Sequence, residues 1–345
     1  MRMILVLLLL PLSLFAQQKN IYKNLVLEGG SVKGIAYAGA FLALEQKGIL
    51  PEIEKVGGSS AGAIAGLMVC IGFNASEIDS LISKLALQQF NDGRGGIFGK
   101  YRRLRKKFGI YRGDKFEKWL YQLVAFKTGN ANLTFADLHR MRLENKQYKD
   151  LYCTGTNLTK QQLDVFSYET TPDMSIALAV RISGSIPFYF EPVLLTDDKR
   201  KIERSDTTRA RNYYVDGGML CNYPISMFDT CESGSNPLLC DKVRFNRETL
   251  GIKLERPQQI GNFENDNIAI PGYTINKLSD FLTAFGNLTV ETMNRKYPNL
   301  ENERGRTIYV SFGDIKAKIR RMKPEEKKLL FENGFNAACN FLAGY

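Results

Sequence analysis

The chain contains very little histidine. His139 is the only one in 345 residues, so a serine hydrolase with the usual Ser–acid–His order would have no other imidazole to use as its base. His139 lies in TFADLHRMR, next to Asp137 and Arg140 on a predicted polar helix face. We therefore predict a surface position for His139, and a catalytic serine in this chain needs a different base.

Other signatures are also missing from the sequence. No zinc-ligand spacing is present, and no nucleic-acid-binding module can be recognised. We expect no metal, no cofactor and no nucleic-acid partner. Because neither an internal repeat nor a convincing linker occurs, residues 17–345 are predicted to form a single domain.

Long apolar runs are limited to the N-terminus. Arg2 precedes an apolar run at residues 4–15, and Ala16 follows it. This layout predicts a signal peptide at residues 1–16, cleaved near Ala16, with a retained membrane anchor as the alternative. The mature protein is then expected to be exported, to a periplasm, an outer surface or the medium.

The chain has six cysteines, which can form disulfides if the protein is exported to an oxidising compartment. Cys231 and Cys240 flank the short loop ESGSNPLL and are the best candidate pair. Free buried thiols are the alternative for these two residues. The domain is large enough to fold without such a bridge.

The net charge of +11 is clustered along the chain. Residues 91–112 are rich in glycine and basic residues and are predicted to form a surface excursion. Its cations favour contact with an anionic lipid surface, and a simple solvated face is the alternative. The candidate contact residues are Arg102, Arg103, Arg105, Lys106 and Lys107.

Two strand–loop–helix units stand in succession near the N-terminus. Residues 24–30 predict a strand that ends in paired glycines, and a helix follows up to Gly48. Residues 52–58 and 61–72 repeat the pattern. Successive units of this kind indicate an α/β fold with parallel strands, so the loops at 29–34 and 57–61 should be neighbours at one sheet edge.

The stretch VGGSSAGAIAG contains the candidate nucleophile. Gly58 to Gly62 fits G-x-S-x-G with Ser60 at the centre, whereas a frame centred on Ser59 would need glycine at Ala61. Small residues let the strand and the helix approach each other around a sharply turned serine. The pattern therefore selects Ser60, which the N-terminus of the following helix also faces.

Asp216 is the best candidate for the base. It ends a predicted strand and precedes Gly217 and Gly218 in YYVDGG, on a tight turn. A carboxylate that is held close to the serine and partly desolvated can accept its proton. A plain Asp-Gly turn without a catalytic role is the alternative.

The glycine-rich stretch EGGSVKG is the third candidate element. Its spacing fits neither common nucleotide-binding loop, and backbone N–H groups at a helix start can hold a developing oxyanion. The predicted donors are Gly29, Gly30, Ser31 and Val32, while Lys33 adds positive potential and Gly34 supports the loop.

Taken in order, these motifs resemble the patatin-like phospholipase family. Gly29 to Gly34 resembles the family's G-G-x-x-[KR]-G loop, with Ser31 where many members have a third glycine. Gly58 to Gly62 resembles its G-x-S-x-G, and Asp216 to Gly218 its D-G-[GA]. The stretch from Ser183 to Phe190 is similar to its Ser-x-x-x-Pro-x-x-Phe turn.

This resemblance implies a three-layer α/β/α fold with a mainly parallel sheet. It also implies hydrolysis of lipid acyl esters by a dyad of Ser60 and Asp216 through an acyl-enzyme, without a metal. Ile186, Phe188, Tyr189 and Phe190 could line an acyl channel, or they could pack in the core. An esterase or thioesterase on the same fold and a catalytically silent lipid-binding module remain the alternative functions.

Overall fold

The computed structural model describes residues 22–203, 206, 208, 211–240, 242–264, 303–315 and 322–343, with short pieces between residues 272 and 288. The predicted signal peptide at residues 1–16 lies outside this part of the chain. Within the described residues, no helix has the length and apolarity needed to cross a bilayer.

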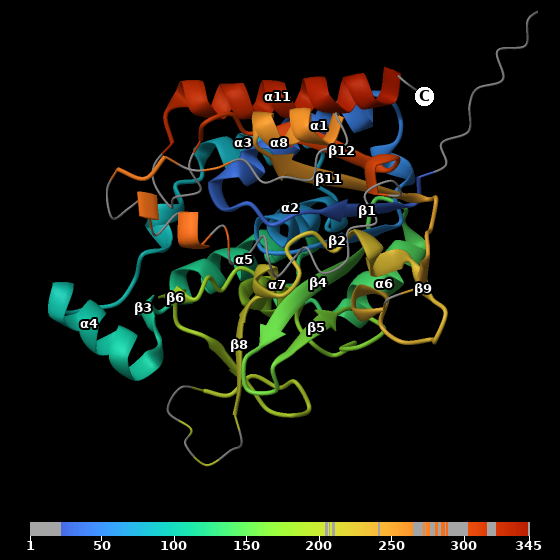
Figure 1. The fold of residues 1–345 in the computed structure, drawn as a ribbon. Coiled ribbons are helices and arrows are strands. Elements are labelled where there is room, and N and C mark those ends of the chain that lie inside the picture. The colour runs from blue at the N-terminus through green and yellow to red at the C-terminus, as the bar shows by residue number, and fades with distance from the viewer. Residues whose placement is uncertain are drawn as a thin grey trace, which may run out of the picture.

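A central sheet organises the fold, with strand order β12-β11-β1-β2-β4-β8-β7 and with β5 paired to β4 (Figure 1). The strands of this sheet are β1 (Asn24–Leu27), β2 (Lys55–Gly58), β4 (Asp150–Asn157), β5 (Gln162–Phe166), β7 (Val193–Leu195), β8 (Asn212–Asp216), β11 (Thr249–Glu255) and β12 (Thr307–Ser311). Two small sheets pair β3 (Gly109–Tyr111) with β6 (Phe188–Phe190), and β9 (Thr230–Cys231) with β10 (Val243–Arg244).

Most of the central sheet is parallel. The pairs β12–β11, β11–β1, β1–β2 and β2–β4 are parallel, whereas β5, β8 and β7 join antiparallel at the other side. The strands β1 and β2 are buried along almost their whole length, as parallel strands covered on both faces must be. The predicted α/β class with a mainly parallel sheet is thus confirmed.

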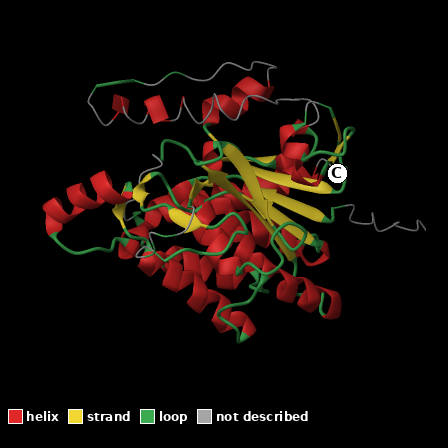
Figure 2. Cartoon of the chain, turned by 90° about the horizontal axis from the view of Figure 1, so that it is seen from below, coloured by secondary structure: helices red, strands yellow, loops and turns green. Residues whose placement is uncertain are grey.

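Helices flank this sheet (Figure 2). The helices of the described residues are α1 (Ala36–Gln46), α2 (Ala61–Cys70), α3 (Ala75–Lys84), α4 (Gly96–Lys107), α5 (Asp114–Thr128), α6 (Phe135–Glu144), α7 (Ile176–Ser183), α8 (Pro257–Glu264) and α11 (Pro324–Ala343), of which α4 projects away from the sheet (Figure 1). Short 3₁₀ turns include η1 (Ser31–Ile35) and η5 (Ile225–Phe228). Glycines let α1 and α11 pack closely, because a Cβ on Gly39 would lie only 1.9 Å from the Phe331 carbonyl oxygen.

The layers meet around the ends of β1 and β2. Gly66 of α2 faces Val56 and Leu151 on one side of the sheet. On the opposite side, Gly57 faces Met227 in the η5 turn. Burial of apolar residues on both faces fixes the register of the two strands, and with it the loops that follow them.

The basic excursion at residues 91–112 contains regular structure that the sequence did not reveal. The helix α4 occupies its centre, and β3 follows at Gly109. The helix α3 begins with a capping box, in which the side chains and backbone N–H groups of Asn74 and Glu77 exchange hydrogen bonds of 2.9 and 3.0 Å.

Cys231 and Cys240 form a disulfide with a Cα–Cα distance of 5.9 Å. Of the two alternatives for these cysteines, the bridge is the one that the structure contains. It closes the loop between β9 and β10, next to the η5 turn.

Candidate active site

Ser60 stands at the turn between β2 and α2. Its backbone has φ 51° and ψ −118°, a combination that costs energy for any residue with a Cβ. A Cβ on Gly58 would lie 2.6 Å from the Gly62 carbonyl carbon, and one on Gly62 would lie 2.3 Å from the Leu27 oxygen. The two glycines of G-x-S-x-G therefore let the strand and the helix close around the serine.

Asp216 lies directly against this serine. The Ser60 hydroxyl donates a 2.6 Å hydrogen bond to Asp216 Oδ2, across 156 positions of sequence. The other carboxylate oxygen, Oδ1, accepts the Gly218 N–H at 2.8 Å. Gly217 must lack a side chain, because a Cβ there would lie 2.0 Å from Thr154 Oγ1. The turn thus fixes the carboxylate through one oxygen and presents the other to the serine.

The direction of β8 explains how the two residues meet. Gly58 at the end of β2 pairs with Cys153 of β4. The antiparallel strand β8 enters from beyond that end and stops with Asp216 opposite Gly155, two positions further along β4. Ser60 also lies two positions past Gly58. Each residue of a strand advances by about 3.3 Å, so Ser60 and Asp216 lie at about the same distance beyond the end of β2.

Burial changes the acidity of this carboxyl group. It raises the pKa of Asp216 to about 6, while the hydrogen bonds from Ser60 and Gly218 limit the rise. The group is therefore more basic than an ordinary aspartate and still ionised above pH about 6. That combination suits a base that must take a proton from a hydroxyl.

Ser59 and Ser183 support the serine turn. The Ser60 N–H donates to Ser183 Oγ at 2.9 Å. Ser59 Oγ lies 2.5 Å from Thr154 Oγ1 and donates to the Cys221 carbonyl at 2.6 Å. Its side chain is buried and points away from the position that Ser60 occupies beside the carboxylate, so only Ser60 is placed next to Asp216.

The glycine loop lies beside the serine, as predicted from the parallel strands. A Cβ on Gly29 would come within 3.2 Å of Ser60 Cβ, and one on Gly34 within 3.1 Å of Ala61 Cβ. Ser31 has φ 51°, a left-handed conformation that glycine adopts more easily. Glycine at this third loop position would relieve the strain.

One of the four predicted oxyanion donors is directed elsewhere. The Gly29 N–H donates to the Asn222 carbonyl at 2.9 Å, so its inclusion among the donors was wrong. Gly30, Ser31 and Val32 stay as predicted donors. The N–H groups of Ser31 and Val32 stand in the first turn of η1, where a helix leaves such groups without intrahelical acceptors. Lys33 places its ammonium group 3.5 Å from the centre of the Phe312 ring.

Two polar residues that the sequence did not single out brace this loop. Asn222 Nδ2 donates to Glu28 Oε1 and to the Gly29 carbonyl, both at 3.1 Å. Glu28 Oε2 accepts the Leu254 N–H at 2.7 Å. Burial and the neighbouring Glu255 raise the pKa of Glu28 to about 8. The sequence does carry a sign of the role of Glu28, because a glutamate stands there at the end of an apolar strand and directly before paired glycines.

Two cavities adjoin the glycine loop, and one of them contains Ser60. A polar one of about 240 Å³ is lined by Ser60, Asp216, Lys33, Asn222, Ile186 and Pro187, among others. A smaller apolar one of about 60 Å³ is lined mainly by Val32, Ile64, Met68, Leu85 and Met322. Ser31 borders both. The site therefore offers a polar and an apolar compartment on the two sides of the glycine loop.

Of the two alternatives for Ile186, Phe188, Tyr189 and Phe190, an acyl channel or the core, neither holds for all four residues. Ile186 does line the polar cavity. Phe190 is buried in the core, and Phe188 is 70% exposed on the surface. The Tyr189 hydroxyl donates to Asn91 Oδ1 at 2.5 Å. The apolar compartment is built instead by α2, the end of α3 and Met322.

His139 lies at the opposite end of the sheet. Its Nδ1 is 2.9 Å from Asp150 Oδ1, and its ring stacks on Tyr168 with centroids 3.9 Å apart. Asp150 pairs with Lys55 at the start of β2, whereas Ser60 follows the end of that strand. The imidazole is half-buried rather than freely exposed, and its contacts are structural.

Comparisons with known proteins agree with this architecture. A family model described as patatin-like phospholipase matches residues 25–229. The chain is 35% identical over 212 residues to the uncharacterized protein YqhO of Bacillus subtilis (strain 168), covering 60% of this chain and 67% of that protein. It is 28% identical over 263 residues to the probable lipid hydrolase 463L of Invertebrate iridescent virus 6, covering 74% and 80% of the two chains.

A solved structure has a similar fold. VipD from Legionella pneumophila superposes with a TM-score of 0.57 and 22% sequence identity, over 94% of this chain and 67% of that one. At this identity, the similarity concerns the arrangement of helices and strands only.

Proposed function

The chain belongs to the patatin-like phospholipase family and is a lipid hydrolase, and from that premise we propose that it cleaves fatty-acyl esters through Ser60 and Asp216. The observation that carries this proposal is the 2.6 Å hydrogen bond from the Ser60 hydroxyl to the buried Asp216 carboxylate, at a strained turn in front of α2.

In the first half of the reaction, Ser60 Oγ attacks the acyl carbonyl carbon and its proton passes to Asp216 Oδ2. The carbonyl oxygen becomes an oxyanion, which the N–H groups of Gly30, Ser31 and Val32 would stabilise. As the tetrahedral intermediate collapses, the proton on Asp216 goes to the departing alcohol oxygen. The acyl group stays on Ser60 as an ester.

In the second half, a water molecule takes the place of the alcohol. Asp216 accepts a proton from the water as its oxygen attacks the acyl carbonyl. Collapse then returns that proton to Ser60 Oγ and releases the fatty acid. The raised pKa of Asp216, about 6, supports both proton transfers, because a more basic carboxylate is a better acceptor.

The two cavities suggest how a lipid is held. We propose that the acyl chain enters the apolar cavity beside Ile64 and Met68, while the alcohol part of the lipid occupies the polar cavity beside Lys33. An apolar wall favours an alkyl chain by about 0.8 kcal/mol per buried methylene. This arrangement places the ester bond at the glycine loop, between the two compartments.

Contact with an anionic lipid surface is part of the proposal. Among the candidate residues, Arg102, Arg105, Lys106 and Lys107 are exposed on α4. Arg103 has a different task, since its Nε donates to the Ile110 carbonyl at 2.8 Å and its Nη1 to the Arg94 carbonyl at 2.7 Å. The four exposed cations are therefore the ones we propose for lipid contact.

Export of the protein is proposed as well. The layout of residues 1–16 supports it, and so does the Cys231–Cys240 disulfide, because such bridges persist mainly outside reducing compartments. Expression of the full chain followed by N-terminal sequencing tests this. A protein that begins at Gln17 supports cleavage, and one that begins at Met1 contradicts it.

The function itself is tested by product analysis on mixed lipids. Wild-type protein should release free fatty acids and the matching deacylated lipids, detected by mass spectrometry, and a fluorophosphonate probe should label Ser60. The Ser60→Ala variant is the control and should do neither. A folded wild-type protein that takes up no probe and releases no fatty acid would favour the silent lipid-binding module.

A further inference from the structure

Helix α4 projects from the body of the molecule, in both Figure 1 and Figure 2. The structure describes the whole helix, and none of its residues is buried. Ile97, Phe98 and Tyr101 are 82%, 89% and 65% exposed. Positions three and four apart share one side of a helix. Tyr101 is three positions from Phe98 and four from Ile97, so the three side chains form one apolar surface, here called the docking face.

The helix contacts the body through its polar side. Arg103 binds the carbonyls of Arg94 and Ile110. Because successive residues of a helix are about 100° apart, Arg103 points to the side opposite Tyr101, two positions before it. Lys100 extends over the Tyr111 ring, with its ammonium group 5.1 Å from the ring centre. A helix of a globular protein normally turns its apolar side toward the core. In α4 the apolar side is turned away from it.

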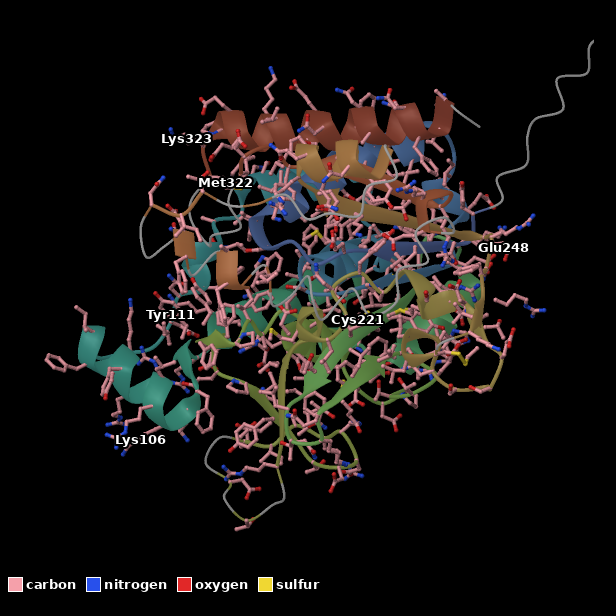
Figure 3. The ribbon with its side chains drawn as sticks, viewed as in Figure 1. Lys106, Tyr111, Cys221, Glu248, Met322 and Lys323 are labelled. Atoms are coloured by element: carbon pink, nitrogen blue, oxygen red, sulfur yellow. A yellow bond between two sulfur atoms is a disulfide. The ribbon has the colours of Figure 1, made fainter. Side chains whose placement is uncertain are left out.

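Exposed cations follow the docking face along α4. Arg102, Arg105, Lys106 and Lys107 are exposed, and Figure 3 shows Lys106 on the projecting helix and Tyr111 near its base. Exposed aromatic and aliphatic side chains beside basic ones are typical of helices that lie in the headgroup region of an anionic bilayer. A second copy of this chain fits less well, because it would bring like charges together on a protein with a net charge of +11.

The docking face is connected to the active-site cavity. The strand β3 follows α4 directly and pairs with β6, with Gly109 opposite Phe188. A Cβ on Gly109 would lie 2.2 Å from the Glu191 nitrogen, so the two strands are in tight contact. Phe188 is exposed, and the preceding Pro187 lines the cavity that contains Ser60. The helix α4 is therefore joined through β3 and β6 to the rim of the site.

We propose that α4 is a membrane-docking element, which inserts the docking face into an anionic lipid surface and sets the mouth of the active-site cavity against it. This inference deepens the proposed function and rests on it, because docking matters only if lipid then reaches Ser60. The cations would provide long-range attraction and the docking face the short-range binding.

Vesicle co-sedimentation tests the proposal. The background is Ser60→Ala, so that the lipids are not consumed, and the vesicles are phosphatidylcholine with or without phosphatidylglycerol. Binding should require phosphatidylglycerol, weaken with salt and fall about tenfold or more in the double variant Ile97→Ser, Phe98→Ser. The matched control is Leu143→Ser, which removes a side chain that is 67% exposed on α6 and should leave binding unchanged.

A second readout does not depend on the double variant. Phe98→Trp in a Trp119→Phe background should show a blue shift of its emission when vesicles with phosphatidylglycerol are added. Equal vesicle binding of the double variant and its parent, or an unshifted emission, would overturn the proposal. So would a wild-type dimer that the double variant alone disrupts, since the docking face would then bind a second copy.

Activity on a short soluble ester separates this proposal from the proposed function. With Ser60 restored, the docking variants should turn over such an ester at the wild-type rate, because the docking face lies outside both cavities. If no ester is cleaved by wild-type protein but vesicle binding still depends on Ile97 and Phe98, the hydrolase proposal fails and the docking proposal stands.

Discussion

Asn222 binds Gly29 at two points. The Gly29 N–H donates to the backbone carbonyl of Asn222 at 2.9 Å, and the Asn222 side-chain amide donates to the Gly29 carbonyl at 3.1 Å. Asn222 belongs to the segment that follows Asp216, so this double contact ties the turn of the base to the glycine loop. The same amide also reaches Glu28. The two parts of the site are thereby held in one geometry.

Removal of this brace should slow catalysis more than it weakens binding. We expect Asn222→Ala to lower kcat about tenfold on a short soluble ester, with KM nearly unchanged, because loop donors act most strongly on the oxyanion. Steady-state kinetics of the folded variant measure this. An unchanged kcat, or a loss confined to KM, would show that Asn222 does not position the loop.

The activity should depend on the ionisation of Asp216. Its pKa is raised to about 6, and only the ionised form can accept a proton, so kcat/KM should fall as the pH drops through about 6. Because Glu28 has a raised pKa as well, about 8, the Glu28→Gln variant shows which of the two groups causes the fall in kcat/KM at low pH. The rates of this variant should be lower than those of the wild type, and its kcat/KM should still fall near pH 6. If the fall at low pH disappears in Glu28→Gln, Asp216 is not its cause.

Two glycines of α2 provide a matched pair for the serine turn. Gly62→Ala should destabilise the fold by about 2 kcal/mol or more, because its Cβ would collide with the Leu27 backbone at 2.3 Å. Gly66→Ala, whose nearest contact is the flexible end of Val56 at 3.1 Å, should change stability by about 1 kcal/mol or less. Urea denaturation distinguishes the two, and equal effects would contradict this account of the turn.

Filling the apolar cavity should change the acyl-chain preference. Ile64→Trp adds volume to its wall, so we expect hydrolysis of long-chain p-nitrophenyl esters to fall about tenfold relative to the acetate ester. The acetate rate reports whether the site is intact. An unchanged preference along the ester series would show that the acyl chain binds elsewhere.

The sequence predicts the local parts of the site better than the contacts between them. The glycines around Ser60 and after Asp216 reveal sharp turns, because only glycine fits where a Cβ would meet backbone. The antiparallel entry of β8, which places Asp216 at the level of Ser60, has no such local sign. Nor does the sequence show that the Gly29 N–H is already bound, since its acceptor is Asn222.

The helix α4 shows a second limit of the sequence. Gly95, Gly96 and Gly99 make the excursion look irregular, yet the first two stand with positive φ at the start of a regular helix. The periodicity of Ile97, Phe98 and Tyr101 also gives no hint that this side faces away from the core. That orientation is visible in the structure, where Arg103 on the other side of the helix binds the carbonyls of Arg94 and Ile110.

The central claim is that Asp216, and not the single histidine, takes the proton of Ser60. The most direct test compares kcat/KM of Asp216→Asn and His139→Ala on one soluble ester at a pH of about 7.5. This pH lies above the pKa of Asp216, about 6, so the wild-type carboxylate is ionised. Asp216→Asn should lose about a thousandfold or more, since an amide cannot accept the proton, while His139→Ala should keep nearly all of its activity. A large loss in His139→Ala together with an active Asp216→Asn would contradict the account.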